Sequence, residues 1–158
     1  MFKLSFAVLV GIVLSANSAS LPGSSLTKYV GPKASQGPLA LSGFTDCGVA
    51  TLVDVTLSGC ASAPCTLNAG SSYTLDVTFR PRDFHWDMSH RAILLRDTQL
   101  LELSDGPIPD STIDPAQVYV FSYTFNAASS HMGQGEFRLK TYQNYVHELC
   151  LVIPINIV

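Results

Sequence analysis

Charged residues are scarce in this chain of 158 residues: they make up 13% of the total, with 9 lysines and arginines against 12 aspartates and glutamates. This balance excludes an acidic disordered tail and a basic nucleic-acid-binding surface. Long hydrophobic runs are also lacking, because Leu4–Leu14 has only about half of the ~20 residues that a membrane-spanning helix needs. With 47% hydrophobic residues, the chain can fill one core. We therefore expect one soluble domain that binds no nucleic acid.

Motifs of enzymes are missing as well. The sequence has no GxSxG turn, no glycine-rich phosphate loop and no HExxH pair, so we expect neither catalysis nor a cofactor or metal. The four histidines fall in expected loops or at strand ends and are interpreted as surface residues: His85, His90, His131 and His147. Asp83 and Asp87 lie near His85 in the sequence, and we expect them to be solvated loop residues.

The N-terminus has the three parts of a secretory signal: Lys3, the apolar run Leu4–Leu14, and small or polar residues through Ser20. A short core helix is the alternative, but the run has no polar face. We expect cleavage after Ser18, with Ser20 as the alternative site, which leaves 8 basic against 12 acidic residues. Because no Asn-x-Ser/Thr sequon would direct lysosomal sorting, secretion is the expected localisation, with the endolysosomal lumen second.

Four cysteines remain in the expected mature chain, and an even number in a secreted protein predicts disulfides. Three pairings are possible. The four-residue spacer of Cys60-Ala-Ser-Ala-Pro-Cys65 suits a small closed loop, which favours 60–65 together with Cys47–Cys150. A zinc site is the rival interpretation, but the spacings contain no paired CxxC or HxxxH unit.

Short runs of alternating apolar and polar residues follow Cys47 and predict an all-β sandwich of about seven strands. In the clearest run, Tyr73, Leu75, Val77 and Phe79 share one face; in the first, Val53 is expected to point inward. Pro154 marks an edge or bulge position in the last run. The expected strands are Val49–Leu57, Tyr73–Phe79, Ala92–Leu95, Gln99–Leu103, Val118–Phe125, Glu136–Thr141 and Leu149–Val158.

Two segments predict irregular structure. Residues 19–43 are rich in Ser, Gly, Pro and Ala, which predicts a loose arm with one edge strand near Leu39–Leu41, before a domain that spans residues 44–158. The stretch Asp105–Ala116 has three prolines and predicts a long surface loop.

Two aromatic groups are candidate binding elements. Arg80-Pro-Arg-Asp-Phe-His-Trp86 gathers Arg80, Arg82 and the only tryptophan, so it could contact a membrane surface or an anionic headgroup. The alternative is a loop whose aromatic rings cover the open end of the core. Alternation places four rings on one strand face, where they either pack the core or line a cavity: Tyr119, Phe121, Tyr123 and Phe125.

Several motifs resemble, in order and spacing, the ML lipid-recognition family, whose members include Niemann–Pick type cholesterol carriers and the mite group-two allergens. The resemblance covers residues 44–158. The motifs are Phe44-Thr-Asp-Cys-Gly48, Cys60-Ala-Ser-Ala-Pro-Cys-Thr-Leu67, Gly70-Ser-Ser-Tyr-Thr-Leu-Asp-Val-Thr-Phe79, Phe121-Ser-Tyr123 and Cys150-Leu-Val-Ile-Pro-Ile155.

The resemblance implies an immunoglobulin-like β-sandwich of two antiparallel sheets, an apolar cavity between the sheets for a sterol or acyl chain, and the cysteine pairing given above. One family disulfide has no counterpart here, since Asp105–Ala116 contains no cysteine. The positions that match the cavity walls are Val55, Leu57, Leu67, Tyr73, Leu75, Val77, Phe79, Leu151, Ile153 and Ile155, to which we add Phe121 and Tyr123.

Three functional hypotheses are compatible with these features. The first is a secreted, monomeric carrier of a sterol, fatty acid or other lipid that makes transient membrane contact. The second is an immune-recognition adaptor that presents a lipid to a receptor. The third is an interaction module with a packed core and no ligand.

Overall fold

The computed structural model describes residues 23–30 and 40–158, which form ten strands and one short 3-10 helix. The expected secretory signal, residues 1–18, lies outside the described residues. No helix among the described residues is long and apolar enough to cross a membrane. The elements are β1 (Gly23–Lys28), β2 (Thr45–Asp46), β3 (Thr51–Leu57), β4 (Cys65–Leu67), β5 (Ser72–Arg80), β6 (Ser89–Arg96), β7 (Gln99–Pro107), β8 (Tyr119–Asn126), η1 (Ser129–His131), β9 (Gly133–Gln143) and β10 (Val146–Ile157).

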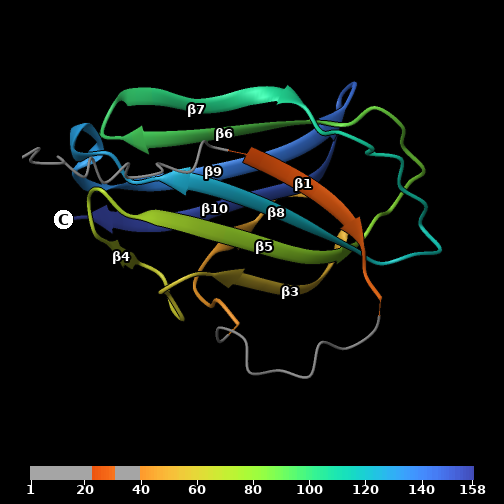
Figure 1. Ribbon diagram of the computed structural model, residues 1–158, viewed down its shortest axis with the longest axis horizontal. Coiled ribbons are helices and arrows are strands. Elements are labelled where there is room, and N and C mark those ends of the chain that lie inside the picture. The colour runs from red at the N-terminus through yellow and green to blue at the C-terminus, as the bar shows by residue number, and fades with distance from the viewer. Residues whose placement is uncertain (1–22, 31–39) are drawn as a thin grey trace, which may run out of the picture.

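The strands form two layers, as in an immunoglobulin-like β-sandwich (Figure 1). One sheet has the order β1-β8-β5-β3, and the other has the order β2-β10-β9-β6-β7. Strand β4 adds to the second sheet by pairing in parallel with β10, while the other strand pairings are antiparallel. The fold class expected from the sequence is therefore confirmed, and the short strands β1, β2 and β4 raise the count above seven.

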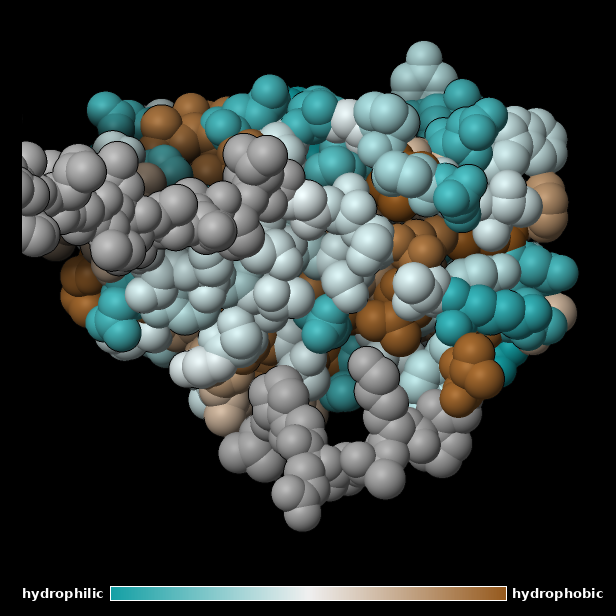
Figure 2. Space-filling model, viewed as in Figure 1, coloured by the Kyte–Doolittle hydropathy of each residue, from teal (hydrophilic) through white to brown (hydrophobic). Residues whose placement is uncertain are grey.

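Strand β5 shows how alternation in the sequence builds the sandwich. Tyr73, Leu75, Val77 and Phe79 are buried, whereas the polar residues between them are partly exposed. Successive side chains of a strand point to opposite faces, so this pattern directs one face into the core and the other to solvent. The outward face of the four-stranded sheet is accordingly mostly pale to hydrophilic in Figure 2, with apolar side chains in brown toward the right of the view.

A bulge in β3 corrects the prediction for Val53. The pairing of β3 with β5 shifts register between Leu52 and Asp54, and Val53 between them is 60% exposed instead of buried. Because a bulge inserts one residue without a partner, the alternation of side chains is interrupted at that point. The residues after the bulge, Val55 and Leu57, point inward as expected.

Pro154 lies in the middle of β10, between the segment of β10 that pairs with the short strand β2 and the segment that pairs with the short strand β4. Strand β2 pairs with Leu151 and Val152, and β4 pairs with Ile155 onward, so Pro154 faces the gap between β2 and β4. Proline has no N–H to donate, and this is the position in β10 where no donor is required on that side.

Two segments expected to be irregular contribute to the packing. Gly23–Lys28, within the expected loose arm, forms β1 and pairs with β8 along its whole length. Strand β7 continues into the expected loop as far as Pro107, and beyond it Ile108 and Ile113 are buried in the core. This segment is therefore a surface loop only in part, because its two isoleucines gain by leaving water.

The disulfides are Cys47–Cys150 and Cys60–Cys65, as the sequence favoured. The glycine that follows Cys47, Gly48, is required by close packing of two backbone segments. A Cβ at this position would lie 2.5 Å from the carbonyl oxygen of Glu148. Only glycine lets the two backbones approach this closely, so that Val49 and Ala50 can donate hydrogen bonds to the same carbonyl.

Candidate functional site

The space between the sheets is lined by apolar side chains from both layers. All twelve residues expected at the cavity walls are buried there. The four-stranded sheet contributes those of β3, β5 and β8, and the other sheet contributes those of β4 and β10. The structure therefore brings together residues that lie up to 100 positions apart in the sequence.

Aromatic rings connect the two layers at the centre of this space. Phe137 of β9 stacks on Phe125 of β8 with centroids 4.6 Å apart, and Tyr123 lies 6.0 Å from Phe137. Aromatic pairs at these distances add about 0.5–1.5 kcal/mol to the area that they bury. Of the two interpretations of the aromatic face of β8, core packing is the one present here.

A chain of polar side chains crosses between the sheets at one edge of the sandwich. His90 hydrogen-bonds through Nδ1 to the Ser24 hydroxyl (3.2 Å) and through Nε2 to the Ser104 hydroxyl (3.0 Å). Ser104 hydrogen-bonds in turn to the Tyr123 hydroxyl at 2.8 Å. These four residues belong to β1, β6, β7 and β8, so the bonds join the edge strand of each sheet to a strand of the opposite sheet, β1 to β6 and β7 to β8. We call Ser24, His90, Ser104 and Tyr123 the polar seam.

Burial sets the protonation of the polar seam. It lowers the pKa of His90 from its usual value, although the charge of Asp105 opposes this shift. It also raises the pKa of the Tyr123 hydroxyl. Both groups are therefore held in their neutral forms, as desolvation favours for any ionisable group. His90 was expected at the surface, and it is only 7% exposed because alternation along β6 turns it inward.

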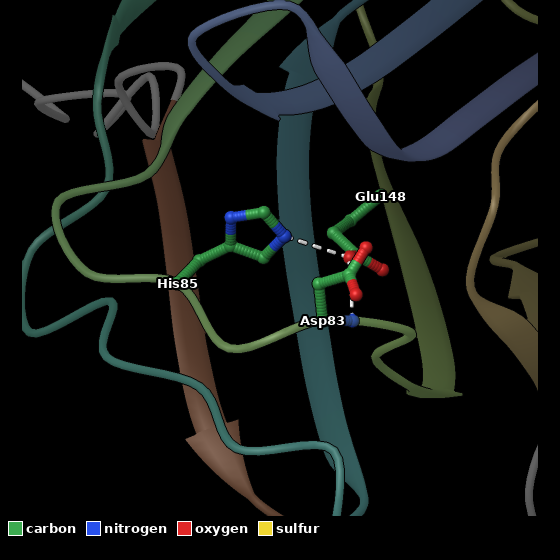
Figure 3. A group of neighbouring side chains, drawn as sticks. All are labelled: Asp83, His85 and Glu148. Carbon is green, nitrogen blue, oxygen red and sulfur yellow. Dashed lines mark hydrogen bonds and ion pairs between the residues drawn. The ribbon is translucent and has the colours of Figure 1, made fainter.

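A buried carboxylate organises the loop that follows β5. Glu148 on β10 has no exposed surface and accepts hydrogen bonds from the backbone N–H groups of Arg82 (3.0 Å) and Asp83 (3.2 Å). It is also 2.8 Å from Nε2 of His85, as Figure 3 shows. His85 uses its other nitrogen to bond the side chain of Gln143. His85 was expected at the surface too, and these two partners explain its burial.

Asp83, His85 and Glu148 place three potential metal-ligand atoms within 4.8 Å of one another. However, both ring nitrogens of His85 and both carboxylate oxygens of Glu148 already have protein partners. A cation would have to displace these hydrogen bonds. The cluster therefore acts as an anchor for the loop, and Asp83 itself is exposed as expected.

The tip of the same loop presents aromatic rings to solvent. Phe84 is 52% exposed and Trp86 is 60% exposed, and their rings meet edge to face with centroids 5.8 Å apart. Arg82 is exposed beside them, while Arg80 donates a hydrogen bond to the carbonyl of Pro115. Both rings are more than half exposed, whereas the anchor points His85, which lies between them in the sequence, inward.

Sequence reasoning missed several residues of the interior. Phe137, Leu139, Ala92 and Leu94 are buried on the inner face of the second sheet. The signal for the first two was present, since they alternate with charged residues in the run Glu136–Thr141. Ser24 and Glu148 gave no signal, because their partners lie 66 and 63 residues away in the sequence.

The architecture defines a class of proteins: β-sandwiches that face two apolar sheet surfaces toward each other. No model of a known protein family matches the sequence, and no curated protein matches it. Among solved structures, the chain is similar to a Niemann-Pick type C2 protein from the Japanese carpenter ant, with a TM-score of 0.57 and 17% identity. The similarity covers 73% of this chain and 98% of the other. The two proteins share a fold.

Proposed function

We propose that this protein is a secreted, monomeric carrier that binds an apolar lipid, such as a sterol or fatty acid, between its two sheets. The observation that carries the proposal is the apolar lining contributed by both sheets, which ends at a polar seam where a lipid's hydroxyl or carboxyl group could bind. The shared fold and the motifs that resemble the ML family support it. Two disulfides and the expected signal support secretion.

The packed interior is, in this proposal, the form without ligand. An empty cavity of ~400 Å³ would cost ~10 kcal/mol, which is as much as the stability of many domains. The sheets therefore close when no lipid is bound. A lipid of ~28 heavy atoms that contributes ~0.3 kcal/mol per atom would bind with ~8 kcal/mol, near micromolar affinity. Such an affinity allows both uptake and release.

We infer that the lipid enters between β1 and β7, because the chain does not connect the two sheets at that edge. At the opposite edge, β3 continues directly through the disulfide loop Cys60–Cys65 into β4, so the chain itself joins the sheets there. At the β1 and β7 edge, the polar seam and partly buried side chains such as Leu26 and Leu103 hold the sheets together. Both edges are visible in Figure 1, with β7 and β1 on the upper side and β3 below.

Native mass spectrometry of protein purified from a eukaryotic secretion host, followed by organic extraction, tests the proposal. We expect a stoichiometric lipid adduct. Val77→Phe fills the interior, so it should reduce occupancy, whereas Leu94→Ala enlarges the space and should retain binding. Val53→Phe is the matched control because this side chain points outward. A clean mass after incubation with sterols, fatty acids and phospholipids, in a protein with native circular dichroism, would contradict lipid carriage and favour a ligand-free interaction module.

We further propose that the loop tip of Arg82, Phe84 and Trp86 contacts the membrane from which the lipid is taken. Exposed aromatic rings beside a cation are suited to the headgroup region. Because Trp86 is the only tryptophan, its fluorescence reports this contact directly. Vesicles of phosphatidylcholine and phosphatidylserine should shift its emission to shorter wavelength, and Phe84→Ser should weaken the shift.

Tyr145→Ala is the matched control for the membrane experiment, since Tyr145 is 99% exposed in the turn between β9 and β10. This variant should behave like the original protein. Emission that does not change with vesicles would contradict membrane contact. In that case, a stable complex with a receptor ectodomain would favour the adaptor hypothesis.

A further inference from the structure

A pocket of about 350 Å³ lies on the outer face of the six-stranded sheet, on the side away from the proposed lipid site. Its side chains come from β6, β7 and β9, from the turn between β9 and β10, and from the start of β10. On β9 they alternate with the buried residues Phe137, Leu139 and Thr141, so the pleat of the strand directs them outward. We call this site the outer pocket. Because it is separate from the lipid site, a ligand can bind there whether or not the protein carries a lipid.

Basic side chains gather at the outer pocket. Arg91, Arg138 and Lys140 line it together with His147, and no acidic residue is part of the lining. The chain has only nine lysines and arginines and a net charge of −3, so a third of its strongly basic residues lie at one site on an acidic protein. Arg138 is paired with Glu136 at 2.6 Å, and Arg91 has carboxylate partners as well, so Lys140 is the strongly basic side chain of the pocket that has no ion pair among the described residues.

The register of the sheet places two of these cations directly opposite each other. Arg91 on β6 pairs with Lys140 on β9, and like charges in such a cross-strand pair destabilise a sheet. Arg91 is compensated by Glu102 (2.7 Å) and Asp105 (3.6 Å). Lys140 forms no ion pair with any residue in the described part of the chain. An anion bound between Arg91 and Lys140 would remove the repulsion.

The rest of the outer pocket is apolar or neutral. Ile93 and Leu100 supply aliphatic surface, and Leu100 is 55% exposed. The Tyr142 hydroxyl donates a hydrogen bond to the Asp105 carboxylate, and burial together with this bond raises the pKa of Tyr142. Tyr142 therefore stays uncharged and offers its ring to a ligand.

We propose that the outer pocket binds a small organic anion, in which a carboxylate or phosphate group is attached to an apolar or aromatic body. The anionic group lies between Arg91 and Lys140, with Arg138 nearby, and the body contacts Ile93, Leu100 and the ring of Tyr142. A volume of about 350 Å³ is at the lower end of the range for small-molecule sites, about 300–1,000 Å³. A small solute is therefore the occupant, and not an extended lipid.

Titration with phenyl phosphate, followed by ¹H–¹⁵N chemical shifts of the folded protein, tests the site. We expect saturable shifts confined to amides of β6, β7 and β9, the turn between β9 and β10, and the start of β10. Inorganic phosphate, which lacks the apolar body, and benzyl alcohol, which lacks the charge, should each bind at least about ten-fold more weakly. Raising the salt concentration from about 50 to about 300 mM should weaken binding, because the site is open to solvent.

Lys140→Gln should weaken phenyl phosphate binding about ten-fold without changing the fold, since this lysine has no ion pair to lose. Lys28→Gln on β1 is the matched control, because it removes an exposed lysine from the other sheet. Equal effects of the two variants would overturn the proposal, as would the absence of saturable shifts. Equal affinity for inorganic and phenyl phosphate would overturn the role of the apolar body. Binding to anionic vesicles alone would identify a membrane surface and overturn the small-molecule site.

Discussion

Glu148→Gln should destabilise the protein strongly although it changes only one atom. In the folded state, one carboxylate oxygen accepts from His85 and the Asp83 N–H, and the other accepts from the Arg82 N–H. A glutamine has one carbonyl oxygen and one NH₂ group. Whichever way it is oriented, at least one backbone N–H faces another donor in a site with no exposed surface. An unsatisfied buried donor costs about 1–3 kcal/mol, and the remaining bonds lose their charged acceptor.

We therefore expect the free energy of unfolding to fall by roughly 2–4 kcal/mol, a large part of the 5–15 kcal/mol typical of a domain. Urea unfolding followed by Trp86 fluorescence measures it, and the slope with denaturant should not change. Glu136→Gln is the control, because this carboxylate is about 40% exposed in its pair with Arg138 and should contribute at most about 1 kcal/mol. If the two variants lose equal stability, the buried anchor has no special role and the reasoning is refuted.

Other predictions use the same measurement. Burial lowers the pKa of His90, so the unfolded chain binds a proton at this residue more readily than the folded chain does. The free energy of unfolding should therefore be greatest above pH 6.5 and fall as the pH drops below it. The fall should be smaller in His90→Gln. Gly48→Ala should destabilise by more than about 2 kcal/mol because the new Cβ meets the Glu148 carbonyl, whereas Gly106→Ala, with no atom within 4 Å, should cost less than about 1 kcal/mol. Phe137→Ala should cost about 3–5 kcal/mol through the cavity left in the ring stack.

Local pattern was enough to predict much of the fold. Strands β5, β8 and β10 follow from alternation alone, because each buries one face against the opposite sheet. The disulfide pairing also followed from spacing, since the short Cys60–Cys65 loop left a single partner for Cys47. These features depend on neighbours in the sequence.

Features that depend on distant partners could not be predicted in this way. His85 is a loop residue by pattern and is buried only because Glu148, 63 residues later, is brought beneath it. The outer pocket is a similar case, because only the register of β6 with β9 shows that Arg91 lies opposite Lys140. Likewise, the polar segment that forms β1 becomes a strand because β8 offers it an unpaired edge.

The two edges of the sandwich differ in how strongly they are closed, and this bears on the proposed carrier function. The Cys47–Cys150 disulfide ties β10 to the segment that follows β2 in the same sheet, and this segment runs past the Glu148 carbonyl directly into β3 of the other sheet. The polar seam contributes hydrogen bonds between neutral groups, each worth about 1 kcal/mol net. Separation of the sheets at the β1 and β7 edge therefore breaks only a few such hydrogen bonds and apolar contacts, whereas at the other edge the chain itself joins the sheets on both sides of β3. If a lipid enters, the molecule should open on this side and keep the covalently joined edge as its hinge.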